Sequence, residues 1–409
     1  MKALFAIYNR LKKYGIIQAV KDRLYRIANW MLNIRWHGGF INSDVTAFDI
    51  HWNGRIVRDW EKLGPRPIKS MTWFIPAFSE PHAGITNILY FIKYLVDKGI
   101  KINIVLLANW IGMRYCLGVL NNGNYEWVKK VRIFLGPDIK KLPYTDAGVA
   151  TQCDTIYSLV KYNNTNSKFY FIQDDERLMY KDKYKKWLAW RTYTMGFPAF
   201  ASADCLKQMY KDEFSGKCES YFAALNIERP YELRYKNHIK RLFFYARPEK
   251  EQDRNGFEFG LEGLKEIRKR HPEIEIVSAG SNMKFNDKGI GIRQMGNIPL
   301  KKMKEFYLSC DVGLHILLSK HTGVLPFEMM ATSCAVMTNR QKYADRWLKD
   351  GENCVMFDLD AKSIADAFDR LWKFEDYYNY VIYNGWKIVS EMKPVEEEVA
   401  RVASKMFGV

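Results

Sequence analysis

The order of strands and helices along the chain places the strongest constraint on its fold. Two series of alternating segments are separated by a polar, charged stretch at residues 231–240. The first includes the strand-like SMTWFIPAF (70–78), the helical GITNILYFIKYLVDKG (84–99) and the strand-like KINIVLLAN (101–109); the second begins with RLFFYARP (241–248). Strands that alternate with helices of about 10–15 residues are typical of βαβ units and parallel sheets. We therefore predict an α/β fold with two Rossmann-like domains that face each other across a cleft.

Length supports this division, because 409 residues exceed what one ordinary hydrophobic core holds. The last 35 or so residues have a helical pattern throughout. We predict a basic N-terminal extension at residues 1–36, a first domain at 37–235, a second domain at 236–385, and a C-terminal helix at 386–409.

The N-terminal extension combines positive charge with apolar residues at helical spacing. Residues 1–36 hold eight Lys and Arg and one acid, Asp22, a local charge of about +7, and Trp30 and Trp36 lie near the end. Basic amphipathic helices with aromatic residues bind anionic membrane surfaces. The alternative is a helix that packs on its own domain with a solvated basic face.

Composition narrows the compartment and the partners. The net charge of +17 implies an anionic partner. The seven cysteines are scattered with no CxxC pair, no apolar run reaches the length of a transmembrane helix, and the N-terminus lacks a signal-peptide pattern. We expect a cytoplasmic protein, peripheral on the inner face of the cell membrane.

Three stretches of the second series have the composition of a ligand site. In open α/β sheets, ligands bind at the carboxyl ends of the strands, against helix N-termini. In FFYARPEKEQDRNG, the cations Arg247, Lys250 and Arg254 follow a strand and precede a helix. Arginines at this position suit a diphosphate, which they grip bidentately. The alternative is a charged, solvated loop.

The second stretch is HTGVLPFEMMATSCAVMTN, residues 321–339. Gly323 permits close backbone approach, Pro326 suits a first helical turn, and Glu328 can accept hydrogen bonds from a ligand hydroxyl. The alternative is an acid that complements the helix dipole. In the third stretch, MGNIPLKK, Gly296 and Asn297 precede a helix that opens with Lys301 and Lys302, where a plain helix cap is the alternative to a base-binding loop.

Together these stretches resemble the GT-B nucleotide-sugar glycosyltransferases, specifically the retaining family 4 type. YAR with Arg254 downstream, MGNIPL, CDVGLHIL, and GVLPFEMMA followed by CAVMTN correspond to successive parts of that pattern, over about residues 241–360. A closer likeness is to bacterial rhamnosyltransferases that build polyrhamnan chains on surface glycans, S-layer glycans among them. It rests on GVATQCDTIYSLVKYNNTNSKFYFIQDDE, GFPAFASAD and FFYARP…RNGFEFGLEGL, and implies dTDP-β-L-rhamnose as the donor.

The resemblance implies that the C-terminal helix at 386–409 packs back on the first domain. It also implies roles for particular residues. The donor-binding residues would be Arg247, Arg254, Gly296, Asn297, Lys302, Gly323, Val324, Leu325 and Glu328, with Glu328 on the nucleoside sugar and the amides around Gly323–Leu325 facing the diphosphate. The chain departs from the pattern at Lys320, where the family has an acid, at Ala246, which replaces a glycine, and at Gly84, which stands alone where a glycine pair is usual.

The remaining polar residues bear on the acceptor side of the site and on whether the enzyme needs a metal ion. Gly84, Asp174 and Asp175 are predicted to face the acceptor. His82 and the Asp174–Asp175–Glu176 run are the candidates for a catalytic base; the alternatives are a loop histidine with its hydrogen bonds satisfied and an acidic run with a structural role. Asp358 and Asp360 form an Asp-x-Asp, but they precede a helical pattern and are predicted to cap it. We therefore expect a metal-independent enzyme with no cofactor.

We predict a hexosyltransferase that moves a sugar, L-rhamnose from dTDP-β-L-rhamnose, onto a growing cell-surface glycan on a lipid-linked acceptor, with retention of configuration. Two alternatives stay open. A sugar-nucleotide epimerase of similar fold would act on the donor without an acceptor. A nucleic-acid-binding protein fits the +17 charge, although the aromatic residues do not follow the patterns of RNA-binding or OB-fold modules.

Overall fold

The computed structural model describes residues 68–409. It leaves out residues 77, 79–82, 108–115, 119, 121–125, 136–138, 223–224, 226, 230, 249–252, 320, 322 and 344–345. The predicted extension at residues 1–36, and with it the predicted membrane contact, lies outside the described residues, as do His82, Lys250 and Lys320.

The first domain is built on a seven-stranded sheet with the order β3-β2-β1-β4-β5-β6-β7, in which each neighbouring pair is parallel. The apolar segments predicted as strands form its centre, where β1, β2 and β5 lie buried. The strands are β1 (Ser70–Pro76), β2 (Lys101–Leu107), β3 (Arg132–Leu135), β4 (Thr145–Ala150), β5 (Thr165–Ile172), β6 (Ala199–Ala201) and β7 (Cys218–Ser220).

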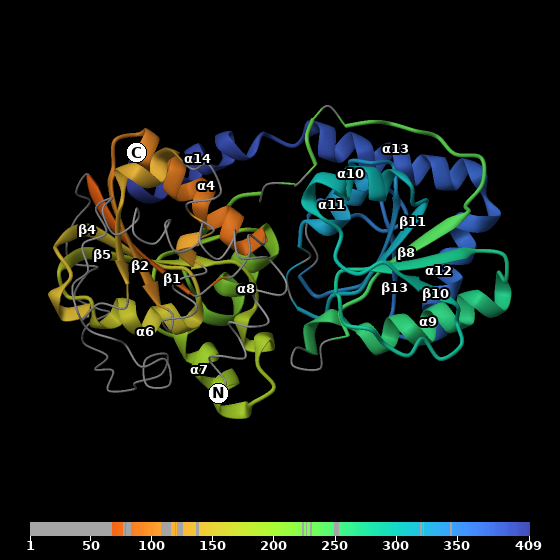
Figure 1. The fold of residues 1–409 in the computed structure, drawn as a ribbon, viewed down its shortest axis with the longest axis horizontal. Helices are drawn as coiled ribbons and strands as arrows, with labels where there is room; N and C mark the ends of the chain where they lie inside the picture. Colours follow the sequence, from red (N-terminus) through yellow and green to blue (C-terminus); the bar gives the residue numbers. More distant parts are fainter. Residues whose placement is uncertain are drawn as a thin grey trace, which may run out of the picture.

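Helices cover both faces of this sheet (Figure 1). One face packs on α4 (Ala83–Asp97) and on α14 (Val395–Phe407) from the end of the chain. The other face packs on α6 (Cys153–Lys161), α7 (Lys183–Tyr193) and α8 (Asp204–Phe214). Short 3₁₀ turns are η2 (Glu126–Lys130), η3 (Ile139–Lys141) and η4 (Glu176–Met179).

The second domain is built on a six-stranded parallel sheet with the order β10-β9-β8-β11-β12-β13. Its strands are β8 (Arg241–Tyr245), β9 (Glu275–Ala279), β10 (Ile292–Gln294), β11 (Val312–His315), β12 (Ala335–Asn339) and β13 (Val355–Phe357). The helices α9 (Phe257–Arg270) and α12 (Ala361–Lys373) cover one face, and α10 (Leu300–Leu308) and α11 (Leu325–Met330) cover the other. The turn η5 (Asp253–Asn255) joins β8 to α9.

Local sequence determines several of the element ends. The Asp360 carboxylate accepts a 2.8 Å hydrogen bond from the Ser363 amide at the start of α12, which confirms the predicted helix cap. Asp182 caps α7 in the same way through the Lys185 amide at 2.8 Å. Gly99, with φ +82°, follows α4 in the left-handed conformation that glycine adopts without strain.

The chain crosses back to the first domain near its end. Helix α13 (Glu375–Glu391) stays on the second domain and runs unbroken across the boundary predicted at residue 386. After a short link at Met392–Pro394, α14 packs on α4, with Val402 and Phe407 in the core of the first domain. The predicted fold, two Rossmann-like domains with a C-terminal helix that crosses back, is confirmed (Figure 1).

Two simpler features follow from the fold. All seven cysteines are free thiols, and Cys218 is the one that is not fully buried. Among the helices in the described part of the chain, none is both long and apolar enough to cross a membrane.

Candidate active site

Topology places the candidate site before any side chain is considered. In each sheet the strand order reverses beside the first strand: β1 lies between β2 and β4, and β8 lies between β9 and β11. At such a reversal the following loops diverge to opposite faces and open a crevice at the carboxyl ends of the strands. The residues that follow β8 and β11 should therefore line a ligand site in the second domain. In the first sheet, β5 lies two strands from β1 and ends at the same edge as β1 and β4.

Arg247 lies at the carboxyl end of β8. Its Nη1 donates a 3.0 Å hydrogen bond to the Tyr245 hydroxyl, and its guanidinium lies 6.0 Å from the centre of the Tyr245 ring. The same ring contacts His315 at the end of β11, with centroids 5.8 Å apart. Arg247 is thus held at the strand reversal that topology marks as the ligand crevice.

His315 contributes an uncharged imidazole to this group. Its side chain is buried, and burial, with a smaller contribution from His321, lowers its pKa to about 3. Its Nδ1 is a buried atom with no hydrogen-bond partner among the described residues. His315 therefore stays neutral at physiological pH and can offer either a donor or an acceptor, depending on its tautomer.

Arg254 connects the two domains. In η5, its Nη1 forms an ion pair with the Asp174 carboxylate, which follows β5 of the first domain. The Arg254 carbonyl also accepts a 2.6 Å hydrogen bond from the Leu318 amide, in the loop after β11. A cation predicted to bind the donor is thus fixed at both ends and already holds a carboxylate.

His321 lies beside this ion pair. Burial lowers the pKa of His321 below its usual range; the negative charge of Asp174 opposes that change and the positive charge of Arg254 adds to it. The loop that carries His321 is anchored at Leu317, whose amide and carbonyl both bond to the Asn339 side chain. The imidazole is therefore a neutral group at the meeting point of the two domains.

The acidic run after β5, Asp174 to Glu176, has partners inside the first domain as well as across the cleft. Asp175 accepts a bidentate pair of hydrogen bonds from Arg177, at 2.6 and 2.7 Å. Glu176 is buried beside α6, where it accepts a hydrogen bond from the Cys153 amide. Burial raises the pKa of Glu176 to about 8. Asp174 is the member of the run that reaches the second domain.

Glu328 lies inside the second domain in the first turn of α11. Its side chain is buried, and its Oε2 accepts a 3.1 Å hydrogen bond from the Tyr307 hydroxyl of α10. Burial, and then the charge of Glu328, raise the pKa of Tyr307 well above its usual value. The Tyr307 hydroxyl therefore stays a donor that orients the carboxylate.

The loop before α11 spans the two domains. Gly323 has φ +73°, and a Cβ added there would meet no atom within 4 Å, so the space beside it is open. Val324 packs against the core of the first domain and Leu325 against the core of the second. The predicted donor residues 323–325 thus lie at the domain junction.

The predicted base-binding turn is part of a tight loop after β10. Gly296, with φ +75°, accepts a 3.1 Å hydrogen bond from the Gly280 amide, and the Asn297 amide donates a 2.8 Å hydrogen bond to Asn282. A Cβ at Gly296 would lie 2.8 Å from the Asn282 side-chain oxygen. Asn297 and Lys302 have exposed side chains.

On the first domain, Gly84 lies in the first turn of α4, after β1. Among the described residues, no group of three or more His, Cys, Asp or Glu side chains could hold a metal ion.

Two groups were missed by the sequence interpretation, His315 and His321. His315 ends β11 within CDVGLHIL, and His321 follows in the loop that opens HTGVLPFEMMATSCAVMTN. Their position at the carboxyl end of a central strand was available from the sequence, but the contact with Tyr245 and with the Arg254–Asp174 pair depends on the packing of the two domains.

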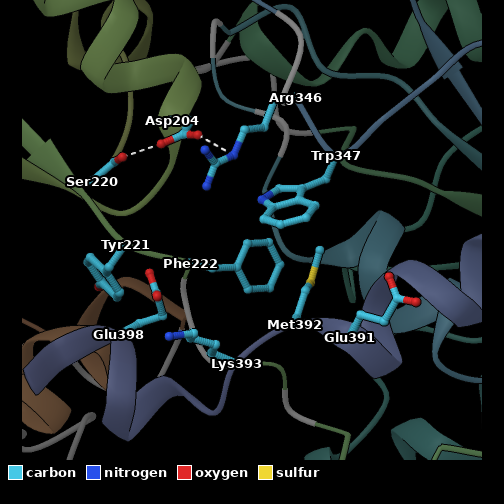
Figure 2. A pocket seen from close by; sticks show the side chains of 10 residues that line it. All are labelled: Asp204, Ser220, Tyr221, Phe222, Arg346, Trp347, Glu391, Met392, Lys393 and Glu398. Atoms are coloured by element: carbon cyan, nitrogen blue, oxygen red, sulfur yellow. Dashed lines mark hydrogen bonds and ion pairs between the residues drawn. The ribbon is translucent and has the colours of Figure 1, made fainter. Parts of the chain in front are cut away.

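A separate cavity of about 230 Å³ lies where the two connecting segments pass between the domains (Figure 2). Phe222 belongs to the first connection and Met392 to the second, and Trp347 faces them from the second domain. Above them, Arg346 Nε pairs with Asp204 at 2.6 Å. This ion pair is a second polar bridge between the domains, away from the strand reversals.

Two facing Rossmann-like domains with a C-terminal helix that returns to the first define the GT-B fold. Solved structures agree. HepE of Anabaena in complex with UDP-glucose has a TM-score of 0.61 at 11% identity, covering 82% of this chain and 100% of that chain. WaaG, a glycosyltransferase involved in lipopolysaccharide biosynthesis, has a TM-score of 0.54 at 8% identity, covering 83% of this chain and 100% of that chain. At these identities the likeness concerns the fold.

Comparisons of sequence give relatives with more specific descriptions. Residues 240–369 match the family described as WsaF, C-terminal domain. Over 308 residues the chain is 29% identical to the O-antigen biosynthesis protein RfbC of Myxococcus xanthus. That alignment covers 71% of this chain and 23% of the relative, so the chain spans about a quarter of the relative's length.

Proposed function

We propose that this chain is a glycosyltransferase that moves a sugar from a nucleotide-sugar donor onto a cell-surface glycan. The observation that carries the proposal is the position of Arg247 and Arg254 at the carboxyl end of β8, beside a strand reversal and opposite the first domain. The relatives support it, since they include an O-antigen biosynthesis protein and a protein of the same fold solved with UDP-glucose.

In this proposal the second domain binds the donor. Arg247 and Arg254 neutralise the diphosphate, as guanidinium groups do with bidentate hydrogen bonds. Glu328, oriented by Tyr307, accepts hydrogen bonds from a hydroxyl of the nucleoside sugar. The amides of residues 323–325 complete the diphosphate contacts, and Gly296, Asn297 and Lys302 lie on the base side.

Asp174 has a defined part in this scheme. Its carboxylate holds Arg254 and stands in for the negative charge of a diphosphate. A bound donor replaces this carboxylate on the guanidinium and releases Asp174 toward the acceptor. Gly84 and Asp175 stay on the acceptor side of the cleft.

The reaction breaks the bond between the anomeric carbon and the diphosphate oxygen and forms a bond to an acceptor hydroxyl oxygen. The electron pair of the broken bond stays on the diphosphate, where the two arginines stabilise the added charge. We propose that this needs no divalent metal. We also propose retention of the anomeric configuration; an inverting reaction would need a base beside the acceptor hydroxyl, for which His82 and Asp174 are the candidates.

The finer assignments follow the sequence resemblance. We propose dTDP-β-L-rhamnose as the donor and a lipid-linked glycan at the inner face of the cell membrane as the acceptor. Residues 1–36, with a charge of about +7, would hold the enzyme at that surface.

The test is a thermal-shift screen of nucleotide sugars with the full chain, because preferential stabilisation reports the ligand of the folded state. We expect dTDP-sugars to raise the melting temperature most, and Arg247→Ala and Glu328→Ala to reduce that shift. Incubation with donor alone then separates the enzyme classes, because an epimerase converts the donor without an acceptor. No stabilisation by any nucleotide sugar would contradict the proposal.

Two further measurements test metal dependence and stereochemistry. Full transfer activity in EDTA is the expected result; activity lost in EDTA and restored by a divalent ion would contradict metal independence. A proton spectrum of the new linkage tests retention, since a β-configured donor that gives an α-linked product would mean inversion.

A further inference from the structure

Helix α7 carries large aromatic residues on the side that faces solvent. Tyr184 is 53% exposed, Trp187 44% and Trp190 43%, although tryptophan is seldom left this open on a protein surface. The three side chains are spaced three residues apart and so share one side of the helix. The opposite side is buried on the first domain through Leu188, Ala189, Thr192 and Tyr193.

The exposed rings are already in contact with one another. Tyr184 and Trp187 are stacked, with centroids 6.0 Å apart and an interplanar angle of 18°, and the Arg191 guanidinium lies 5.4 Å from the Trp187 ring. A sugar ligand would stack on a free aromatic face, but the faces of Trp187 are engaged by a ring and a cation. The exposed ring edges suit insertion among lipid headgroups, where Trp and Tyr side chains gather.

Positive charge surrounds these rings. Residues 181–193 contain five Lys and Arg and one acid, Asp182, a local charge of about +4. Lys183, Lys185 and Lys186 form no ion pair with any carboxylate of the described residues. Basic residues that flank interfacial aromatic residues bind anionic lipid headgroups, and long lysine side chains reach that layer easily.

The position of α7 relates this surface to the cleft. The helix lies at the lower end of the first domain in Figure 1 and follows η4, which contacts η5 of the second domain. On its buried side, the Tyr193 hydroxyl donates to the Asp174 carbonyl at 3.1 Å and accepts from the Glu176 amide at 3.0 Å. A surface on which α7 docks is therefore connected, through Tyr193, to the acidic run that enters the cleft.

We infer that the solvent side of α7 docks on an anionic membrane surface, with Tyr184, Trp187 and Trp190 at the depth of the headgroups. Residues 1–36 of the chain are a poor occupant for this side, because their charge of about +7 repels the charge of α7. The inference rests on the proposed function only for the lipid-linked acceptor, and its test does not use transfer activity.

A local fluorescent probe on the full chain tests the inference. Six of the seven native cysteines are buried, so a cysteine introduced by Trp190→Cys can be labelled preferentially with an environment-sensitive dye such as NBD. The control is Tyr380→Cys, a residue that is 51% exposed on α13, the helix drawn on the opposite side of the molecule from α7 in Figure 1. We expect a blue shift at residue 190 with phosphatidylglycerol vesicles, and none at residue 190 with phosphatidylcholine vesicles or at residue 380 with either.

Vesicle sedimentation gives the affinity. The triple variant Tyr184→Ser/Trp187→Ser/Trp190→Ser should bind phosphatidylglycerol vesicles at least about tenfold more weakly than the parent chain, with an unchanged melting temperature. No shift at residue 190 with anionic vesicles would overturn the inference. So would a shift caused by soluble glycan without lipid, or by raised protein concentration alone, which would indicate a sugar platform or a contact between copies.

Discussion

The ion pair between Arg254 and Asp174 is the residue-scale feature on which the proposed donor site most depends. It explains why a cation predicted for a diphosphate is not simply solvated: the cleft supplies its own anion. The sequence showed the cation and the acidic run as separate patterns about 80 residues apart. Their meeting could not be predicted, because it depends on how two domains pack.

This pair predicts opposite effects for its two members. Arg254→Ala should weaken binding of a nucleotide diphosphate about tenfold or more, since a hydrogen bond to a charged group contributes about 1.5–3 kcal/mol. Asp174→Asn should strengthen it by up to about fivefold, or about 1 kcal/mol, because it removes the charge that competes with the diphosphate for the Arg254 guanidinium. Titration calorimetry measures both.

The matched control is Arg293→Ala, which removes an arginine that pairs with Glu275 on the edge of the same sheet. It should leave the dissociation constant unchanged. If Asp174→Asn weakened binding as much as Arg254→Ala does, Asp174 would be a support for the arginine and no competitor of the ligand.

Glu176 gives a prediction about pH and stability. Burial raises its pKa from 4.5 to about 8, so between these values the folded chain holds a proton that the unfolded chain has lost. Stability from this group is therefore present below about pH 4.5 and is lost as pH rises to about 8, by at most about 1.4 kcal/mol per pH unit.

Glu176→Gln keeps the shape of the side chain and stays neutral at every pH, so the variant does not lose stability at this position as pH rises. The melting temperature of the variant relative to the parent should rise between pH 5 and pH 8 and then level off. Parallel pH profiles for the two proteins would mean that Glu176 ionises normally in the folded state.

At the scale of elements, the strands of the two sheet centres were predictable, and the short strands at or next to an edge were not. Central strands such as β1 and β8 are apolar runs bounded by turns. In contrast, β6, β7 and β13 have three residues each, too few to show any period. These strands form because they pair with a neighbouring strand, and the local sequence pattern does not show that pairing.

Helix α9 shows how glycines allow two elements to approach closely. A Cβ at Gly263 would lie 2.5 Å from the Ile364 side chain of α12, which is fully buried and cannot move aside. Gly263→Ala should therefore destabilise the protein by about 1–3 kcal/mol through overpacking. This outweighs the gain of about 1 kcal/mol that alanine brings to a helix.

Chemical denaturation of Gly263→Ala tests this, with Lys265→Ala on the exposed side of the same helix as the control. The control should change stability by less than about 0.5 kcal/mol. A stabilised Gly263→Ala would show that α9 and α12 can separate without cost.

At the scale of the whole molecule, the two domains are joined by more than their connecting segments. Ion pairs cross between them at Arg254–Asp174 and at Arg346–Asp204, and Val324 of the second domain packs on the core of the first. The C-terminal helix that completes the first domain was predicted from the family resemblance, because periodicity alone shows a helix and not its partner.

That crossing predicts a domain-specific loss of stability. Phe407 of α14 is buried in the first domain, with ring centroids 5.1 Å from Phe169 and 5.5 Å from Phe200. Phe407→Ala should cost about 3–5 kcal/mol, the usual loss for a buried phenylalanine. Hydrogen exchange should show reduced protection in β5 and β6 with little change in β8 and β11, because α14 contributes to the first core and not to the second.

Lys405→Ala, on the exposed side of α14, is the control and should leave both sheets protected. Equal loss in the two sheets would mean that the domains unfold as one unit, and unchanged protection in β5 would mean that α14 is not needed to complete the first domain.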